Sequence, residues 1–169
     1  TSIQFDHQKL GQSIRKGKVE NIVLAERPGK RGFDPSKVPG LVIDHSPADS
    51  GRYIGSPSIA ILPDGTYVAS HDFFGPKANH TKSASSLVFS SKDKGGTWQK
   101  IADITPLFWG KLFVHKEKLY ILGMRCEYGD VLIRRSEDGG HTWTEPDTPQ
   151  VGLLRKGHYH CAPCRILIH

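Results

Sequence analysis

The stretch that decides the fold is Ser91-Lys-Asp-Lys-Gly-Gly-Thr-Trp98, which returns later in the chain as Ser136-Glu-Asp-Gly-Gly-His-Thr-Trp143. Both copies read S-x-D-x-G-x-T-W, and their aspartates, Asp93 and Asp138, lie 45 residues apart (138 − 93). Common propeller families repeat one four-stranded blade every ~40–50 residues. Five fixed positions that recur at this period predict successive blades of a β-propeller.

Each residue type in the repeat has a local role in a tight turn. The aspartate can accept hydrogen bonds from backbone N–H groups of its own turn, and the serine and threonine can bond the backbone more weakly. Gly95 and Gly140 can adopt positive φ at no steric cost. Trp98 and Trp143 then resume the strand and bury a large ring. The repeat therefore predicts a rigid hairpin turn, and it indicates architecture more strongly than catalysis.

Apolar segments on either side of the two turns predict the strands of two blades. In the first blade we expect strands at 57–62, 66–70 and 84–90 and a fourth from residue 97; in the second we expect 111–115, 119–123 and 130–135. Residues 71–83 read as a long polar loop. Further strands are expected at 19–24 and 41–44, from an incomplete blade, and at 160–168, as the first strand of a third blade. His158, Tyr159 and His160 are expected at the start of that blade.

The repeated stretch resembles the Asp-box (BNR repeat) of the sialidase, or neuraminidase, superfamily. This resemblance covers residues 52–169, with residues 1–51 as an N-terminal segment. It implies an all-β fold, a six-bladed propeller when complete, and an exo-acting glycoside hydrolase in an extracellular or periplasmic setting. Because propellers close with four to eight blades, we expect the chain to be a fragment that continues C-terminally. A small β-sandwich that contains two such turns stays open as the alternative.

Composition and charge favour a glycan partner over nucleic acid or a membrane. The chain has 169 residues, with 23 Lys+Arg against 17 Asp+Glu, and the basic residues are spread through the turns rather than gathered on one helix face. No apolar run approaches the ~18 residues of a membrane span. A mildly positive face would suit an acidic sugar.

The cysteines predict neither a disulfide framework nor a metal site. Cys126, Cys161 and Cys164 are too few for such a framework. His158-Tyr-His-Cys-Ala-Pro-Cys164 has a single C-x-x-C without a second distant ligand pair. On a strand, Cys161 and Cys164 would face opposite sides. We expect no metal and no cofactor.

The order of the strands predicts which end of the blades is functional. In an antiparallel meander the A–B and C–D turns share one end, and the B–C loops and D–A connections share the other. The repeated turns occupy the first end, so the longer loops at the second end are the expected site of function. This end collects aromatic rings, imidazoles and charged groups: Arg52, Tyr53, Ser56, His71, Asp72, Phe73, Phe74, Asn79, His80, Phe108, Trp109, Arg125, Glu127, Tyr128, Asp130, His158, Tyr159 and His160.

Two positions depart from the sialidase pattern. The Arg-Ile-Pro motif, whose arginine binds the sialic acid carboxylate in that family, corresponds here to Gly55-Ser56-Pro57. The acid/base aspartate of the family falls near Asn79, which cannot transfer a proton usefully. The resemblance implies that the usual tyrosine nucleophile, its glutamate partner and the other two arginines lie in the half of the propeller beyond these 169 residues.

These observations leave three functional hypotheses. The first is a sialidase-like exo-glycoside hydrolase that acts on a terminal, possibly acidic, sugar; the second is a non-catalytic carbohydrate-binding propeller; the third is a propeller used for protein contacts, against which the many charged loop residues argue. The candidate catalytic residues are His71, Asp72 and Glu127, since glycoside hydrolysis typically needs two acid/base groups. The candidate substrate-binding residues are Arg52, Trp109, Arg125, Tyr128 and His160.

Overall fold

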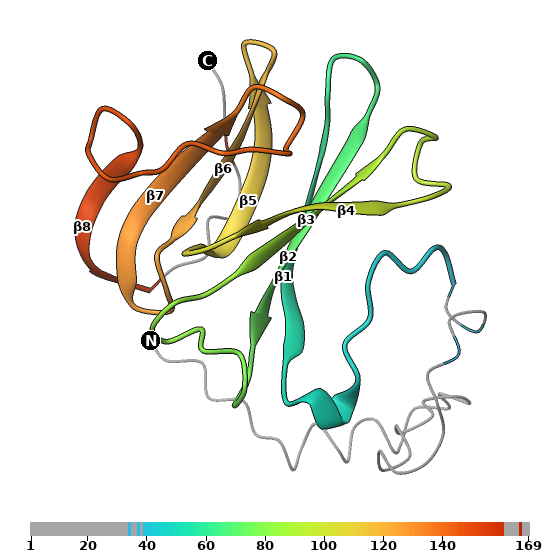
Figure 1. The fold of residues 1–169 in the computed structure, drawn as a ribbon, viewed down its shortest axis with the longest axis horizontal. Coiled ribbons are helices and arrows are strands. Elements are labelled where there is room, and N and C mark those ends of the chain that lie inside the picture. Colours follow the sequence, from blue (N-terminus) through green and yellow to red (C-terminus); the bar gives the residue numbers. More distant parts are fainter. Residues whose placement is uncertain (1–33, 35–36, 38, 161–165, 167–169) are drawn as a thin grey trace, which may run out of the picture. The chain divides into compact units, whose positions relative to one another are not determined.

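The structure, a computed structural model, describes residues 34, 37, 39–160 and 166. These residues form two four-stranded antiparallel sheets (Figure 1). The first sheet contains β1 (Tyr53–Ile61), β2 (Tyr67–Phe74), β3 (Ser86–Ser91) and β4 (Gln99–Ile104). The second contains β5 (Phe108–His115), β6 (Lys118–Met124), β7 (Gly129–Ser136) and β8 (Leu153–Tyr159). A 3-10 turn, η2 (Ala48–Ser50), precedes β1.

Each sheet is a simple meander in which every strand pairs with the next one along the chain. The order is β1-β2-β3-β4 in the first sheet and β5-β6-β7-β8 in the second, with antiparallel pairing throughout. A sandwich of the immunoglobulin type would instead exchange strands between sheets through Greek-key connections. Four consecutive strands per sheet are the plan of a propeller blade, so the predicted all-β fold built from propeller-type blades is confirmed.

The apolar core lies between the two sheets. Because side chains alternate along a strand, Val68 and Val88 of the first sheet point toward the second. There they share one buried cluster with Leu112, Leu119 and Ile121. A smaller cluster on the opposite face of the first sheet contains three further buried side chains, Phe73, Leu87 and Phe89. Full burial of each such side chain contributes roughly 1.5–3 kcal/mol.

The two repeated turns have the same hydrogen-bond pattern. The backbone N–H of Thr97 donates to Asp93 Oδ1 at 2.8 Å, and Thr142 N–H donates to Asp138 Oδ1 at 2.9 Å. In both turns the serine hydroxyl and the threonine hydroxyl also donate to the aspartate. Gly95 has φ +92° and Gly140 has φ +103°, so the positive φ expected at these glycines is confirmed.

The tryptophans that close these turns lock them to the sheets. The indole N–H of Trp98 donates to Gly95 O at 3.1 Å, and that of Trp143 donates to Gly140 O at 2.9 Å. Trp98 packs against the smaller apolar cluster and Trp143 against the larger one. Each turn is therefore fixed both by its own hydrogen bonds and by a half-buried indole ring that packs on an apolar cluster.

The ends of the blades differ as the meander requires. In Figure 1 the β1–β2 and β5–β6 turns lie at the top, and the β2–β3 and β6–β7 loops lie at the bottom. We call the first the turn end and the second the loop end. A backbone bond joins two loops at the loop end, because Glu127 N–H donates to His80 O at 3.0 Å.

Three expectations about strand positions are wrong. Residues 41–44 have no strand conformation. Strand β2 runs on to Phe74, so His71 and Asp72 lie within it and not in a loop. The strand that contains His158 and Tyr159 is the fourth strand of the second blade, paired with β7, rather than the start of a third blade. The expected strand at 19–24, and nearly all of the one at 160–168, lie outside the described residues.

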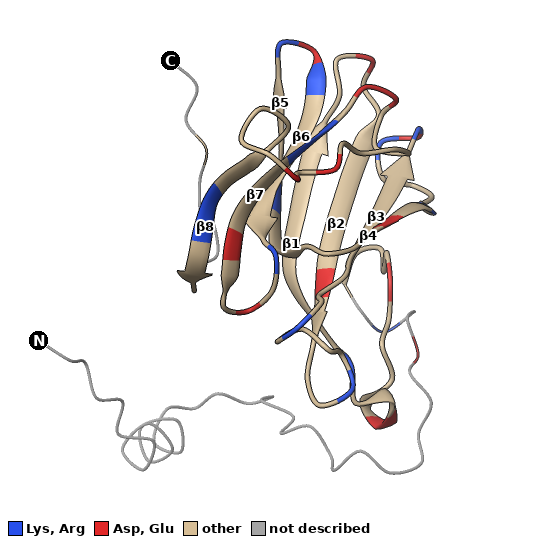
Figure 2. Cartoon of the chain, turned by 60° about the vertical axis from the view of Figure 1, so that its left-hand side comes forward, with Lys and Arg blue, Asp and Glu red and all other residues tan. Residues whose placement is uncertain are grey.

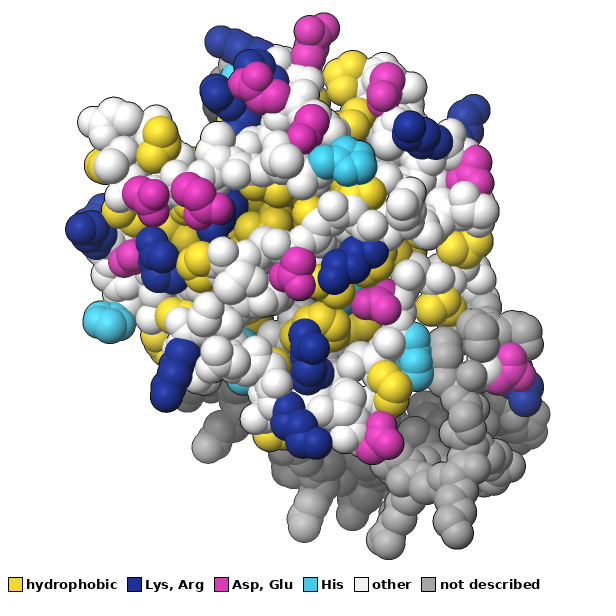
Figure 3. All heavy atoms as spheres, viewed as in Figure 1, with side chains coloured by type: hydrophobic (Ala, Val, Ile, Leu, Met, Phe, Trp, Pro, Cys, Tyr) yellow, Lys and Arg dark blue, Asp and Glu magenta, His cyan; other side chains and the backbone are white. Residues whose placement is uncertain are grey.

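Charged side chains of both signs are mixed over the described surface. Basic and acidic residues are scattered over both sheets and their turns (Figure 2). In Figure 3 apolar side chains occupy the middle of the visible face and charges of both signs surround them. None of the described residues belongs to a helix long and apolar enough to cross a membrane.

Candidate functional site

At the loop end a carboxylate lies between two imidazoles. Glu127, in the β6–β7 loop, places Oε2 3.6 Å from His80 Nε2 and Oε1 3.8 Å from His160 Nε2. His80 comes from the β2–β3 loop and His160 directly follows β8. Three segments that are distant in the sequence therefore present titratable groups to one point. We call Glu127, His80, His160, Trp109 and Tyr128 the loop-end cluster.

Aromatic rings flank this carboxylate. The Trp109 ring meets the His160 ring edge to face with centroids 4.6 Å apart, and the Tyr128 ring stacks on His160 at 4.5 Å. Behind them Phe108, which is buried, stacks on Trp109 at 4.8 Å. Tyr128 is 55% exposed. Exposed rings beside a carboxylate offer a flat apolar surface with an adjacent hydrogen-bond acceptor, which is the chemistry that binds a sugar face.

Arg125, in the same loop, is already paired. Its Nε donates to Asp130 Oδ2 at 3.1 Å, while Gly157 N–H donates to Asp130 Oδ1 at 3.0 Å. The bond from Gly157, with the nearby guanidinium, lowers the pKa of Asp130. The arginine thus ties the loop to the end of β7, and part of its charge is neutralised before any ligand arrives.

Asp72 lies between the two sheets and is only 1% exposed. Its Oδ1 accepts a short hydrogen bond from the Ser86 hydroxyl, and its Oδ2 accepts one from Gly110 N–H at 3.3 Å. Burial raises the pKa of Asp72 to about 7, although Ser86, the Trp109 N–H, the Ser56 hydroxyl and the Gly110 N–H act in the opposite direction. This carboxyl therefore lies beneath the loop-end cluster and has almost no contact with solvent.

His71 points to the other face of the first sheet, because neighbouring residues of a strand alternate. Its Nε2 lies 2.7 Å from Asp44 Oδ2, and its ring stacks on Phe89 with centroids 5.4 Å apart. The guanidinium of Arg52 lies 3.9 Å above the ring of Phe73. His71 and Asp44 line an apolar groove of about 450 Å³ there. The structure therefore separates His71 and Arg52 from the loop-end cluster.

The eight candidate residues thus fall into separate places. Glu127, Trp109, Tyr128 and His160 lie together, Arg125 is in the same loop, and Asp72, His71 and Arg52 are elsewhere. Sequence reasoning placed His80 at the loop end but did not select it. Its partner could not be read from the sequence, because the contact with Glu127 joins loops 47 residues apart (127 − 80).

The two positions that depart from the sialidase pattern have structural roles here. Gly55 pairs with Asp72 in the β1–β2 ladder, and a Cβ at Gly55 would meet the Phe74 ring at 3.1 Å. Asn79 has φ +53°, and its carbonyl accepts bonds from Lys82 N–H and Ser83 N–H. Asparagine tolerates this left-handed conformation better than most residues. Asn79 therefore shapes the turn of the β2–β3 loop.

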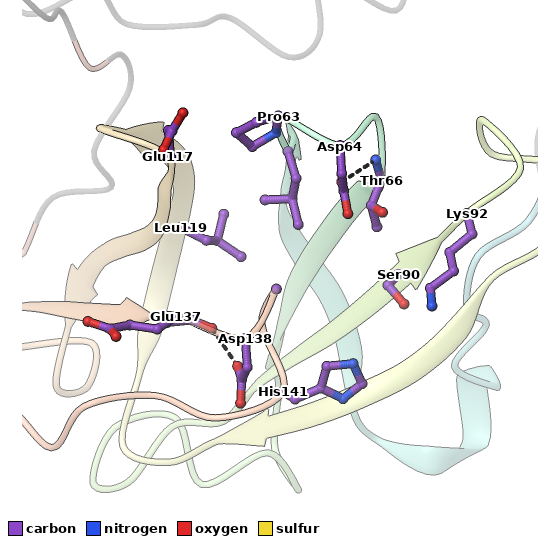
Figure 4. A pocket seen from close by; sticks show the side chains of 13 residues that line it. Pro63, Asp64, Thr66, Ser90, Lys92, Glu117, Leu119, Glu137, Asp138 and His141 are labelled. Carbon is purple, nitrogen blue, oxygen red and sulfur yellow. Dashed lines mark hydrogen bonds between the residues drawn. The ribbon is translucent and has the colours of Figure 1, made fainter.

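A cavity of about 490 Å³ lies at the opposite, turn end, between the β1–β2 turn and the second repeated turn (Figure 4). The carboxylate of Asp64 accepts from its own turn at Thr66 N–H, and that of Asp138 is bonded by Ser136 and Thr142. Because these carboxylates are engaged within their turns, we place the candidate site at the loop end.

Within the part of the chain that the structure describes, no group of three His, Cys, Asp or Glu side chains is arranged to hold a metal ion. Cys161 and Cys164 lie outside the described residues. Cys126, beside the loop-end cluster, is a free cysteine whose Sγ lies 3.4 Å from Tyr128 O.

No protein-family model and no curated protein matches the chain. Several solved structures of glycosidases are similar to it. They include the Penicillium chrysogenum α-L-arabinanase complexed with arabinobiose (19% identity, TM-score 0.43, 57% of this chain and 34% of that chain), a Hadza microbial sialidase (21%, 0.42, 55% and 18%) and the Trypanosoma rangeli sialidase (18%, 0.41, 51% and 14%). The chain spans about a third or less of the length of these structures.

Proposed function

We propose that the protein binds the terminal sugar of a glycan at the loop-end cluster and acts on it as an exo-glycoside hydrolase. The observation that carries the proposal is the Glu127 carboxylate, placed between the imidazoles of His80 and His160 with the rings of Trp109 and Tyr128 beside it. In this proposal residues 52–169 form the propeller blades that carry the site.

Each group in the cluster has a role in this proposal. Trp109 and Tyr128 pack against the faces of the sugar, and His160 donates to or accepts from its hydroxyls. Glu127 serves as one of the two carboxyl groups that glycoside hydrolysis typically uses. The two imidazoles beside it, at 3.6 and 3.8 Å, orient its carboxylate toward the sugar.

The arginines support a neutral sugar better than an acidic one. Arg125 is paired with Asp130, and Arg52 lies over Phe73 away from the cluster. Glu127 itself would repel a sugar carboxylate at this point. The substrate we propose is therefore a terminal neutral sugar, with a sialic acid as the second possibility in view of the sequence resemblance.

A non-catalytic carbohydrate-binding function is the alternative, and one observation favours it. Of the three candidate catalytic residues, only Glu127 lies in the exposed cluster, because Asp72 is buried and His71 faces the other side of the sheet. Without a second carboxyl group the cluster would bind a glycan and leave its linkage intact.

The two functions separate in one series of measurements. The full-length protein is assayed on aryl glycosides that include 4-nitrophenyl α-L-arabinofuranoside and a 4-methylumbelliferyl sialoside, and its binding of arabinobiose and 3′-sialyllactose is measured by calorimetry. For a hydrolase we expect Glu127→Gln to lower kcat by roughly 10²–10⁴-fold, the usual contribution of a general acid or base, with a small change in binding.

Glu117→Gln is the matched control. Glu117 lies in the β5–β6 turn at the turn end, so its change removes the same charge far from the proposed site. We expect normal turnover and binding. Binding without turnover on any substrate would select the alternative function. If Trp109→Ala and Glu127→Gln changed neither binding nor turnover in an active protein, the proposed site would be wrong.

A further inference from the structure

The first strands of both blades are interrupted at the same point. The pairing of β1 with β2 shifts between Gly55 and Ser58, and the pairing of β5 with β6 shifts between Phe108 and Lys111. Ser56 has φ +51° and Trp109 has φ +56° at these bulges. Residues other than glycine rarely adopt this conformation, and it persists where the surroundings hold it.

The carboxyl of Asp72 touches both bulges. It lies on β2 opposite Gly55 and points toward the second sheet. Its Oδ2 accepts from the Gly110 N–H of the second bulge at 3.3 Å, and its Oδ1 accepts from the Ser86 hydroxyl of β3. The Ser56 hydroxyl of the first bulge and the Trp109 N–H of the second also act on this carboxyl, because both lower its pKa. One side chain therefore satisfies donors from two strands that belong to different blades.

The second bulge would otherwise bury unpaired donors. Gly110 is buried, and its N–H has left the ladder with β6 at the register shift. A buried N–H without an acceptor costs about 1–3 kcal/mol. A second contact of this kind lies two residues on, where Leu112 N–H donates to Ser58 Oγ at 2.9 Å. Side chains of the first blade thus complete the hydrogen bonds of β5.

The bulge also sets the direction of the Trp109 ring. Phe108 points into the buried interior at 3% exposure, while the next residue, Trp109, reaches the ring of His160 at 4.6 Å. A regular strand would place these two rings on opposite faces of the sheet, but here they stack with centroids 4.8 Å apart. The conformation of residue 109 is therefore what brings its indole to the loop-end cluster.

We propose that Asp72 is a positioning residue, whose buried carboxyl holds the β5 bulge so that the Trp109 ring faces the sugar. The part that concerns the sugar rests on the proposed function, whereas the hold on the bulge does not. The carboxyl acts through its shape and its acceptor oxygens, because it is too buried to reach a ligand.

This role requires hydrogen-bonding geometry, and it does not require a proton to move. When protonated, the carboxyl can donate to Ser86, whose hydroxyl lies 3.2 Å from Leu107 O. When ionised, it accepts from Ser86, Ser56 and the two N–H groups. In both states Oδ2 remains the acceptor for Gly110 N–H. Asparagine can reproduce this pattern, with its carbonyl facing Gly110 and its amide donating to Ser86.

The test compares four variants of the full-length protein by NMR. Asp72→Asn keeps the shape and loses the acid, Asp72→Glu keeps the acid and loses the geometry, and Asp72→Ala loses both. The control is Ser70→Ala, which removes a buried hydroxyl without a hydrogen-bond partner two residues earlier on the same face of β2. The readouts are amide exchange at Gly110, the indole N–H signal of Trp109, the affinity for arabinobiose and 3′-sialyllactose, and turnover of the aryl glycosides.

We expect Gly110 exchange to be at least about tenfold faster in Asp72→Ala and Asp72→Glu, because the N–H loses its acceptor. The Trp109 signal shifts in both. Asp72→Asn and Ser70→Ala keep the wild-type values for exchange and signal. For whichever sugar the wild-type protein binds, we expect the affinity to fall only in Asp72→Ala and Asp72→Glu. If Asp72→Ala does not fold, Asp72→Glu and Asp72→Asn still show whether residue 72 acts through its hydrogen-bonding geometry or through its acidic group.

Two results would overturn the positioning role. The first is unchanged Gly110 exchange and an unchanged Trp109 signal in the Asp72→Glu and Asp72→Ala proteins. The second is an Asp72→Asn protein that keeps both signals but loses turnover, which would make the carboxyl an acid or base in the reaction. If the wild type binds no sugar and the two NMR readouts behave as expected, the proposed function fails while the hold on the bulge stands.

Discussion

Asp93 and Asp138 act as hydrogen-bond acceptors within their own turns. Bonds from Thr97 N–H and the Ser91 hydroxyl lower the pKa of Asp93 to about 2. The pKa of Asp138 also falls to about 2, because bonds from Thr142 and Ser136 outweigh the opposing effect of desolvation. A carboxylate that accepts several bonds is stabilised in its charged form. These aspartates are therefore committed to structure at neutral pH.

The second turn gives a pH-dependent prediction. A pKa of about 2 in the folded protein, below the ordinary 3.8, means that Asp138 stabilises the fold above pH ~4 and that this contribution is lost as the pH falls through ~2. We expect Asp138→Ala to lower the Tm at pH 7 by ~2–4 °C, the shift that corresponds to about 1 kcal/mol. The measurement is calorimetry at pH 7, 4 and 2.5.

The difference between Asp138→Ala and the wild type should narrow as the pH falls from 4 to 2.5. Asp147→Asn, in the exposed connection before β8, is the control and should follow the wild type at each pH. A Tm difference that stays constant over this range would show that the charge of Asp138 does not contribute.

At the scale of elements, the loop end is built on the close approach of β5 and β6. Gly123 on β6 faces the β5 bulge, and a Cβ there would lie 2.6 Å from Phe108 O and 2.9 Å from the Leu107 side chain. Because the nearer atom is backbone, no rotamer change can relieve the contact. The absence of a side chain at Gly123 therefore allows β5 to form the bulge that presents Trp109.

Gly123→Ala should therefore destabilise the protein by on the order of 1–3 kcal/mol, the usual cost of overpacking. The matched control is Gly55→Ala, whose Cβ would meet only the ring of Phe74, which is 42% exposed and can move. Urea unfolding monitored by circular dichroism compares the two. Equal free energies of unfolding for Gly123→Ala and Gly55→Ala would mean that β5 can move away from an added Cβ without loss of stability.

The strands were predictable where burial alone determines the pattern. The apolar residues of β3, β5, β6 and β7 identified those strands from sequence, with ends that differ by at most three residues. The prediction ended β2 too early because His71-Asp72 reads as polar loop. These side chains are buried only because Asp44, Ser86 and Gly110 supply partners from elsewhere in the chain. Local pattern contains no information about such partners.

At the scale of the molecule, the two ends of the blades have different roles. The turn end is made of short turns whose aspartates bond their own backbone, and the loop end joins three separate segments around Glu127. The repeat at 91–98 and 136–143 placed the loops correctly at the opposite end, because the parity of a meander needs only strand order. Strand order did not say which way each side chain points: Asp72 and His71 face opposite sides of the sheet, so of the three candidate catalytic residues only Glu127 lies in the loop-end cluster.

The three tryptophans allow the most direct test of a loop-end glycan site. Trp109 belongs to the loop-end cluster, whereas Trp98 and Trp143 close the two repeated turns. Their indole N–H signals can be followed by NMR while arabinobiose and 3′-sialyllactose are titrated into the full-length protein. We predict that a bound sugar shifts the Trp109 signal and leaves those of Trp98 and Trp143 in place. A shift of Trp98 or Trp143 with an unchanged Trp109 would place sugar binding at the turn end and contradict the proposed site.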